Sequence, residues 1–245
     1  MVIGGSGFLG SHIVGMLKAH GDVTVGVLDL VQPSASESVK GVEYFIGDIT
    51  DETHLTEVLK QVCPAVVYHT ASPIHGLSPD VYFRVNEEGT HVVVSSCRAA
   101  GIKRIMYTSS TGVVWMGADF ARVKEDDVPV PSKGYDAYHH TKALGEKIIL
   151  NMNDIDGMKV VVLRPCGMTG ERDKQLMWRV AKLYEDGQQN VQIGDNTNLV
   201  DYLYTGNAVQ VHILAADCLL EKPDTVAGQI FFIINGQPMP LWTFN

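Results

Sequence analysis

Short apolar runs alternate with amphipathic segments along the first two thirds of the chain. Parallel strands joined by helices are covered on both faces, so they are typically near-continuous apolar runs of this kind. The pattern predicts strands at residues 1–3, 23–30, 42–49, 65–71, 104–110 and 159–165, and helices at residues 11–20, 52–61, 82–100 and 135–152. We therefore predict an α/β fold built on a doubly wound parallel sheet of the Rossmann type.

The alternation ends near residue 165. Polar stretches such as "GQQNVQIGDNTN" follow, together with one more apolar run at residues 228–236. We expect a cofactor-binding Rossmann domain at residues 1–165, which also carries the candidate catalytic side chains, and a small substrate-binding lobe at residues 166–245 packed on it. A chain of 245 residues, 45% hydrophobic and 19% charged, suits one domain with a large core.

Both ends of the chain are abrupt. The first run supplies only about half of a usual strand of ~5–6 residues before a glycine loop, and the sequence stops on "PMPLWTFN". We therefore expect a fragment of a longer protein with a truncated lobe, so a membrane-associating segment can lie outside it. No apolar run approaches the ~18 residues of a membrane span, and no signal peptide precedes the first strand. The sequence alone predicts an intracellular, cytosolic protein.

Charge and cysteine content exclude two classes of function. The net charge is −9 without any basic run, so the phosphate-neutralising surface of a nucleic-acid-binding protein is missing. No pair of cysteines has C-x-x-C spacing, and none stands beside histidine at metal-ligand spacing. We predict reduced intracellular thiols and no metal site. The four cysteines are Cys63, Cys97, Cys166 and Cys218.

The loop "GGSGFLG" joins the first predicted strand to the first helix. Its glycines Gly4, Gly7 and Gly10 have separate tasks: a tight turn, close approach of backbone to a pyrophosphate, and close packing of helix on strand. The helix N-terminus behind them offers free N–H groups and a partial positive charge. With a strand before it and a helix after it, this spacing predicts a dinucleotide site.

Two aspartates end the next strands. Asp29 lies roughly 20 residues after Gly10, where a carboxylate accepts hydrogen bonds from the adenosine ribose and repels a 2′-phosphate. No arginine follows in "DLVQPSAS", so we predict NAD rather than NADP. The alternative is an Asp that only closes a turn. Asp48 stands where an adenine amino group can be held, or where a carboxylate caps a turn or helix.

Taken together, these and later motifs resemble one enzyme family. The chain is similar to the extended short-chain dehydrogenases/reductases, through "GGSGFLG", "GDIT", "YHTAS", "YTSS", "YHHTK" and "LRP" in family order. Within that superfamily it resembles the 3β-hydroxysteroid dehydrogenase branch, and in particular its decarboxylating sterol-4α-carboxylate dehydrogenases. The narrower resemblance lies in "VVYHTASP", "YTSSTGVVWMGAD", "LVDYLYTGNAVQVHILAA" and "FFIINGQPMPLWTF".

The resemblance implies catalytic roles for three side chains. By itself, a Tyr and a Lys four residues apart on a helix often just pack together. In this family context Tyr138 is the proton-transfer group, and Lys142 lowers its pKa and contacts the nicotinamide ribose. Ser110 orients the substrate oxygen. It is chosen over Ser109 by alignment with the family motif, and Thr111 stays an alternative.

The resemblance also implies a cofactor-binding set. The predicted residues are Gly4, Gly7, Phe8, Leu9, Gly10, Asp29, Asp48, Ile49, His69, Thr70, Ala71, Tyr138, Lys142 and Pro165. His69 is expected to contribute through its backbone. Asn86 either ties its helix to the active-site strand or bonds locally to backbone. His139 and His140 point about 100° apart on a helix, so we expect helix surface or pocket rim rather than a metal site.

The function implied is NAD-dependent oxidation of a 3β-hydroxysterol in sterol biosynthesis. The preferred substrate is a 3β-hydroxy-4α-carboxysterol, whose ketone product loses carbon dioxide; another small hydrophobic alcohol is the broader class. The resemblance also implies a homodimer at the endoplasmic reticulum membrane surface. The alternatives are an NAD-dependent sugar-nucleotide epimerase, an NADP-dependent carbonyl reductase of the same superfamily, and a cofactor-sensing protein without activity.

Overall fold

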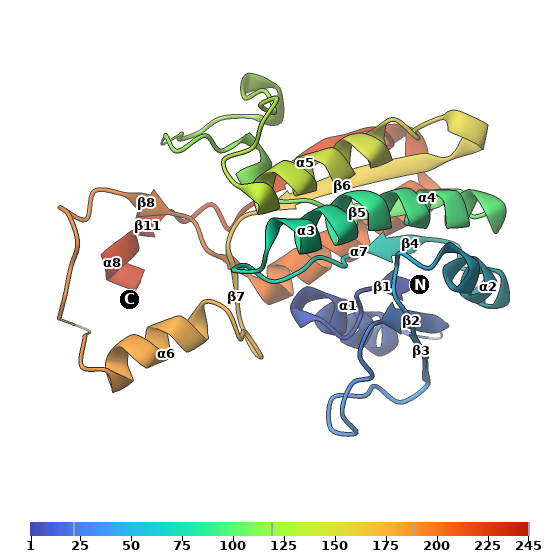
Figure 1. Ribbon diagram of the computed structural model, residues 1–245, viewed down its shortest axis with the longest axis horizontal. Helices are drawn as coiled ribbons and strands as arrows, with labels where there is room; N and C mark the ends of the chain where they lie inside the picture. Colours follow the sequence, from blue (N-terminus) through green and yellow to red (C-terminus); the bar gives the residue numbers. More distant parts are fainter. Residues whose placement is uncertain (22, 119, 189, 245) are drawn as a thin grey trace.

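The central element is one parallel sheet (Figure 1). A computed structural model describes residues 1–21, 23–118, 120–188 and 190–244. Within them, the strand order of the main sheet is β10-β6-β5-β4-β1-β2-β3, with every pairing parallel. The strands are β1 Val2–Ile3, β2 Val25–Asp29, β3 Val42–Ile46, β4 Val67–His69, β5 Arg104–Thr108, β6 Lys159–Pro165 and β10 Ile230–Ile233. The predicted doubly wound parallel sheet is confirmed.

Helices cover both faces of this sheet (Figure 1). On one face lie α1 Phe8–Ala19 and α7 Thr205–Glu221; on the other lie α2 Glu52–Val62, α4 Gly89–Ala99 and α5 Ala137–Leu150. Successive strand residues enter opposite cores: Val161 packs with α1 and α7, whereas Val162 packs with α2, α4 and α5. Burial on both faces explains why the strands are apolar throughout.

The helix predicted at residues 82–100 begins earlier than expected. It starts with α3 Pro79–Tyr82, continues through a π-helical turn at Phe83–Glu88 and runs into α4. Such π-turns are frequent at functional sites because they re-aim side chains. This turn carries Asn86, which is buried.

One expectation about the C-terminal half is wrong. The strand expected at residues 228–236 is not part of the lobe: β10 pairs with β6 and becomes an edge of the main sheet. The reason is burial, because Ile233 and the facing helix α7 belong to the core on one face of the sheet. The division into residues 1–165 and 166–245 stays a prediction, with α7 and β10 packed as parts of the sheet's layers.

What remains of the C-terminal half is a small extension, seen at the left of Figure 1. There β8 Leu199–Val200 pairs antiparallel with β11 Met239–Pro240, beside α6 Met177–Glu185 and α8 Leu241–Phe244. A parallel pair, β7 Met168–Thr169 with β9 Leu203–Tyr204, connects it to the sheet. In the described part of the chain, no helix has the length and apolarity needed to cross a membrane. Short 3-10 turns are at Thr111–Val114, Glu125–Asp127, Ile155–Gly157 and Pro223–Thr225.

Candidate active site

A cavity of about 740 Å³ opens at the carboxyl ends of the strands. The strand order reverses between β1 and β4, which is where open α/β sheets bind ligands. The structure brings nearly all predicted site residues into the lining of this one cavity. Those lining it are Gly4, Gly7, Phe8, Leu9, Gly10, Asp29, Asp48, Ile49, Thr70, Ala71, Ser110, Tyr138, Lys142 and Pro165.

The glycine loop turns sharply between β1 and α1. Gly4 has a φ of +83°, and a Cβ there would lie 2.6 Å from the backbone nitrogen of Ala71. A Cβ on Gly10 would lie 2.2 Å from the carbonyl oxygen of Gly4, so only glycine lets α1 pack this close. Gly7 is the N-cap of α1 and supplies no side-chain cap. The first N–H groups of α1 therefore face the cavity unshielded, which suits a phosphate group.

Asp29 ends β2 at the rim of the same cavity. Its Oδ2 accepts a hydrogen bond from the backbone N–H of Ser6, at 2.9 Å, which anchors the glycine loop. Oδ1 has only a long contact from Val31 N, at 3.4 Å. Half of this carboxylate is thus available to a ribose. Asp48 is more occupied: it accepts from Thr50 and forms an ion pair with Arg84.

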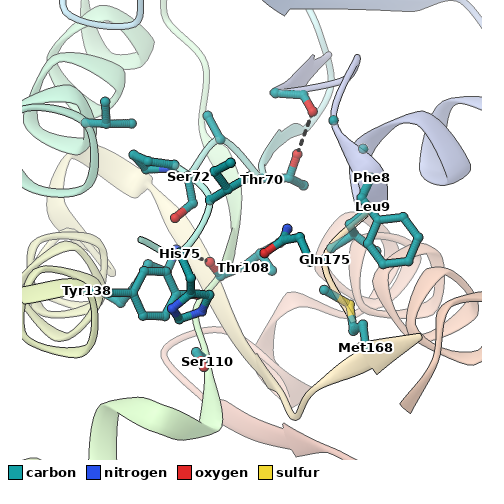
Figure 2. A pocket seen from close by; sticks show the side chains of 18 of the residues that line it. Phe8, Leu9, Thr70, Ser72, His75, Thr108, Ser110, Tyr138, Met168 and Gln175 are labelled. Atoms are coloured by element: carbon teal, nitrogen blue, oxygen red, sulfur yellow. Dashed lines mark hydrogen bonds between the residues drawn. The ribbon is translucent and has the colours of Figure 1, made fainter. Parts of the chain in front are cut away.

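Tyr138 lines the cavity, with its ring against the ring of His75 (Figure 2). The two ring centroids are 4.0 Å apart. Burial raises the pKa of Tyr138 to about 12, although a hydrogen bond with Ser110 opposes the rise. The expected lowering of this pKa by Lys142 is therefore wrong, because the ring is buried and the Lys142 ammonium is directed at the Thr108 carbonyl.

Lys142 is directed at the end of β5 rather than at Tyr138. Its Nζ donates to the backbone carbonyl of Thr108 and stands 4.3 Å from the centre of the Tyr107 ring. Burial lowers the pKa of Lys142 to about 7, while the nearby Glu146 carboxylate opposes that shift. Lys142 can thus exchange a proton near neutral pH.

The two serines that end the YTSS motif have different surroundings. Ser109 is buried, and its Oγ donates to Glu146 Oε2 at 2.6 Å. The same carboxylate receives two hydrogen bonds from Arg164, forming a buried ion pair. Ser110 lines the cavity, and its Oγ accepts from Gly112 N at 3.1 Å. Because the Ser109 hydroxyl is held by Glu146, Ser110, which is hydrogen-bonded to Tyr138, is the one of this pair placed to meet a substrate oxygen.

Asn86 makes contacts that differ from the two predicted ones, and His69 is not part of the cavity lining. Asn86 Oδ1 accepts from Ser72 at 3.0 Å, and its Nδ2 donates to Thr141 at 3.0 Å. It therefore ties the π-helical turn to α5 and to the loop after β4, rather than to the active-site strand or to nearby backbone. His69 is absent from the cavity lining, since its side chain is buried and its Nε2 contacts the Thr90 hydroxyl at 3.1 Å.

The adjacent histidines are held by local contacts. His139 Nδ1 lies 2.7 Å from Asp136, and His140 Nδ1 accepts from Gly134 N at 3.2 Å. Neither lines the cavity. No group of three or more His, Cys, Asp or Glu side chains in the described ranges could hold a metal ion. Cys166 does line the cavity, but burial raises its pKa to about 12, so its thiol is a poor nucleophile.

Sequence reasoning missed the wall of the cavity that faces Tyr138. Part of it comes from the loop after β4, including His75, and part from the segment around α6. The α6 side contributes Asp173, Gln175, Leu176 and Arg179. These side chains stand in no recognisable motif, so only the fold reveals that they share a cavity with Tyr138.

Fold and site together define an extended short-chain dehydrogenase/reductase. The model of the 3-beta hydroxysteroid dehydrogenase/isomerase family matches residues 1–245. The chain belongs to this family, which confirms the resemblance found in the sequence.

Curated relatives carry a narrower name. The chain is 39% identical over 242 residues to the decarboxylating sterol-4-alpha-carboxylate 3-dehydrogenase of Schizosaccharomyces pombe, covering 98% of this chain and 71% of that protein. The protein of the same name from Homo sapiens is 38% identical over 245 residues, covering 99% of this chain and 64% of that protein.

Solved structures agree on the fold. A UDP-glucose 4-epimerase from Thermus thermophilus, in complex with NAD, superposes with a TM-score of 0.79 at 26% identity, covering 97% of this chain and 78% of that one. A UDP-glucose 4-epimerase from Brucella ovis reaches a TM-score of 0.81 at 23% identity over 98% of this chain and 78% of that one, which shows the fold alone.

Proposed function

We propose that the protein oxidises a 3β-hydroxysterol with NAD, and that the substrate is a 3β-hydroxy-4α-carboxysterol whose 3-ketone loses carbon dioxide. The observation that carries the proposal is one cavity that joins the glycine loop to Ser110, Tyr138 and Lys142. The names of the curated relatives support the choice of substrate.

The cofactor residues proposed from the sequence fit NAD. The unshielded start of α1 suits its pyrophosphate, and the free oxygen of Asp29 suits its adenosine ribose. Tyr138, Lys142 and Pro165 line the same cavity, and the nicotinamide end would lie beside them. The likeness to an epimerase in complex with NAD agrees with this choice. When bound, NAD supplies the hydride acceptor.

The side chains of the cavity carry out the proton transfer. Tyr138 Oη accepts the proton of the substrate's 3β-hydroxyl while the substrate carbon that bears this hydroxyl gives up a hydride. Ser110 holds the substrate's hydroxyl oxygen by a hydrogen bond. Because burial raises the Tyr138 pKa to about 12, the phenolate needs nearby positive charge, which Lys142 provides after reorienting from Thr108. The resulting ketone is β to the carboxylate. The bond to carbon dioxide breaks with its electron pair moving toward the ketone oxygen, and Tyr138 returns a proton there.

The apolar part of the cavity lining favours a sterol. Ile74, Leu77 and Val81 come from the segment that follows β4, and Met168 and Leu176 from the segment that follows β6. These apolar side chains suit a fused hydrocarbon ring system.

A direct assay tests the proposal. Purified protein with NAD is offered a 3β-hydroxy-4α-carboxysterol, a plain 3β-hydroxysterol and UDP-glucose, and NADH is followed by absorbance. We expect NADH from the sterols, most rapidly from the carboxylated one, and none from UDP-glucose. No NADH from either sterol would contradict the proposed function.

We also propose a homodimer. In this superfamily, helices equivalent to α4 and α5 pair across a two-fold axis, and here the two helices pack side by side on one face of the sheet. Light scattering at micromolar concentration should give twice the chain mass, and a monomer would contradict this. Because sterols partition into bilayers, we propose that the protein meets its substrate at a membrane surface, by resemblance that of the endoplasmic reticulum.

A further inference from the structure

Two basic side chains in the cavity wall have no part in the chemistry described so far. His75 lies in the loop after β4, Arg179 lies on α6, and both line the same cavity as Tyr138. The His75 ring packs on the Tyr138 ring, as Figure 2 shows. Burial lowers the pKa of His75, and the positive charges of His139 and Arg179 lower it further, against the effect of Asp136.

Neither side chain has a hydrogen-bond or ion-pair partner among the residues that the structure describes. The other charged groups of the wall are already engaged. Arg84 is in an ion pair, and Lys142 donates to a main-chain carbonyl. The carboxylate of Asp173 accepts hydrogen bonds from the backbone N–H groups of Gln175, Leu176 and Met177, at and just before the start of α6. His75 and Arg179 are thus basic side chains of the cavity lining that form no hydrogen bond or ion pair within the described part of the chain.

We propose that His75 and Arg179 bind a carboxylate carried on the carbon next to the reacting carbinol. This rests on the proposed function and names the subsite that selects its substrate. The reacting hydroxyl must reach Tyr138 Oη, so a group on the adjacent carbon lies beside the Tyr138 ring, where His75 is. Arginine offers a planar fork that matches a carboxylate, and neutral histidine offers one N–H donor.

The same contacts suit the step after oxidation. A carboxylate held by His75 and Arg179 stays next to the new ketone, whose oxygen faces Tyr138. When the carbon–carbon bond breaks, the carboxylate leaves as neutral carbon dioxide and its electron pair moves toward the ketone oxygen. The basic pair then loses its anionic ligand. A plain sterol never engages this pair, so the subsite distinguishes substrate from decarboxylated product.

The experiment compares two sterols that differ only in the 4α-carboxylate. For each protein, kcat/KM with NAD is measured for both, and the readout is the ratio of carboxylated to plain. Arg179→Met should lower this ratio roughly 10- to 100-fold, because a charge-assisted pair of hydrogen bonds is lost. His75→Phe keeps the ring against Tyr138 and should lower it roughly 3- to 10-fold. Lys182→Met, on the same helix but bonded to Asp186 outside the cavity, is the matched control.

A binding measurement separates recognition from chemistry. With NADH bound, the alcohol cannot react, so calorimetric titration of the NADH-loaded protein gives the dissociation constant alone. The ratio of dissociation constants for the two sterols should change in Arg179→Met as the kinetic ratio does, and should not change in Lys182→Met. If wild type oxidises both sterols and the ratio is equal in Arg179→Met, the carboxylate subsite is overturned while the proposed function stands. If wild type oxidises neither, both fail.

Discussion

The sheet and the extension around α6 differ in how much of each is buried. Six of the seven residues of β6 are buried, whereas α6 has no buried residue. Trp178 on α6 is 61% exposed and Ile193 beyond it is 76% exposed. The sheet is therefore specified by its own core, while the extension keeps apolar side chains exposed. Exposed apolar surface of this kind marks interaction sites.

The largest expected effect separates chemistry from packing. Tyr138→Phe keeps the ring against His75 but removes the oxygen that takes the proton. Proton-transfer groups contribute ~10²–10⁴ in rate, so turnover with a 3β-hydroxysterol should fall by that factor while NAD affinity changes little. Tyr135→Phe, an exposed tyrosine three residues earlier, is the control. Near-wild-type turnover in Tyr138→Phe would assign the proton transfer to another group.

A second pair of variants tests whether the sheet and the extension around α6 differ in their contribution to stability. Arg164→Met leaves the buried carboxylate of Glu146 without its partner, which typically costs about 3–5 kcal/mol of unfolding free energy. Lys182→Met removes an exposed ion pair of α6 and should cost at most about 1 kcal/mol. Urea denaturation measures both. Equal losses would mean that the extension is as tightly specified as the sheet.

The pH dependence of the unfolding free energy should reveal the lowered pKa of Lys142. Its folded-state pKa is about 7, below the ordinary 10.5, because burial disfavours the ammonium. Between these values the unfolded chain binds more protons than the folded one, so this group makes stability rise with pH, by at most roughly 1.4 kcal/mol per pH unit. The unfolding free energy of wild type relative to Lys142→Met should therefore rise from pH 7 to 9. The matched control is Lys147→Met, an exposed lysine on α5. A flat difference for Lys142→Met would mean that the lysine stays charged when folded.

The smallest expected effect concerns the part of the cofactor site that would bind the adenosine ribose. Asp29→Ala removes the carboxylate that would accept from the ribose and repel a 2′-phosphate, and that also holds Ser6. We expect the preference for NAD over NADP to narrow by roughly 10- to 100-fold, as for the loss of hydrogen bonds to a charged group. Dissociation constants for both dinucleotides provide the test, with the exposed Asp126→Ala as control. Equal binding of NAD and NADP by wild type would refute the interpretation of Asp29.

The sequence could predict the sheet because burial on both faces leaves a continuous apolar pattern, as in β6. It could also predict the lining formed by the glycine loop, Asp29, Ser110, Tyr138 and Lys142, because these residues stand at strand and helix ends in recognisable motifs. Helix α7 was missed although its periodicity is clear: Ala208, His212, Ala215, Ala216 and Leu219 are among its buried residues, at helical spacing.

Other features had no local signal. The Lys142 ammonium is directed by a carbonyl of β5, which only the packing of α5 on the sheet brings near. Likewise, Glu146 meets Ser109 and Arg164 only through tertiary structure. The place of β10 beside β6 depends on which strand edge is open. Long-range placement of this kind leaves no periodic trace in one sequence.

The central claim is decarboxylating oxidation of a sterol, and the joint stoichiometry of its two products tests it most directly. Wild-type protein is given excess NAD and a limiting amount of a 3β-hydroxy-4α-carboxysterol, and NADH and carbon dioxide are quantified from the same reaction. The account predicts equal molar amounts of both, with NADH but no carbon dioxide from the sterol that lacks the carboxylate. Absence of NADH from both sterols, together with conversion of UDP-glucose to its 4-epimer, would contradict it.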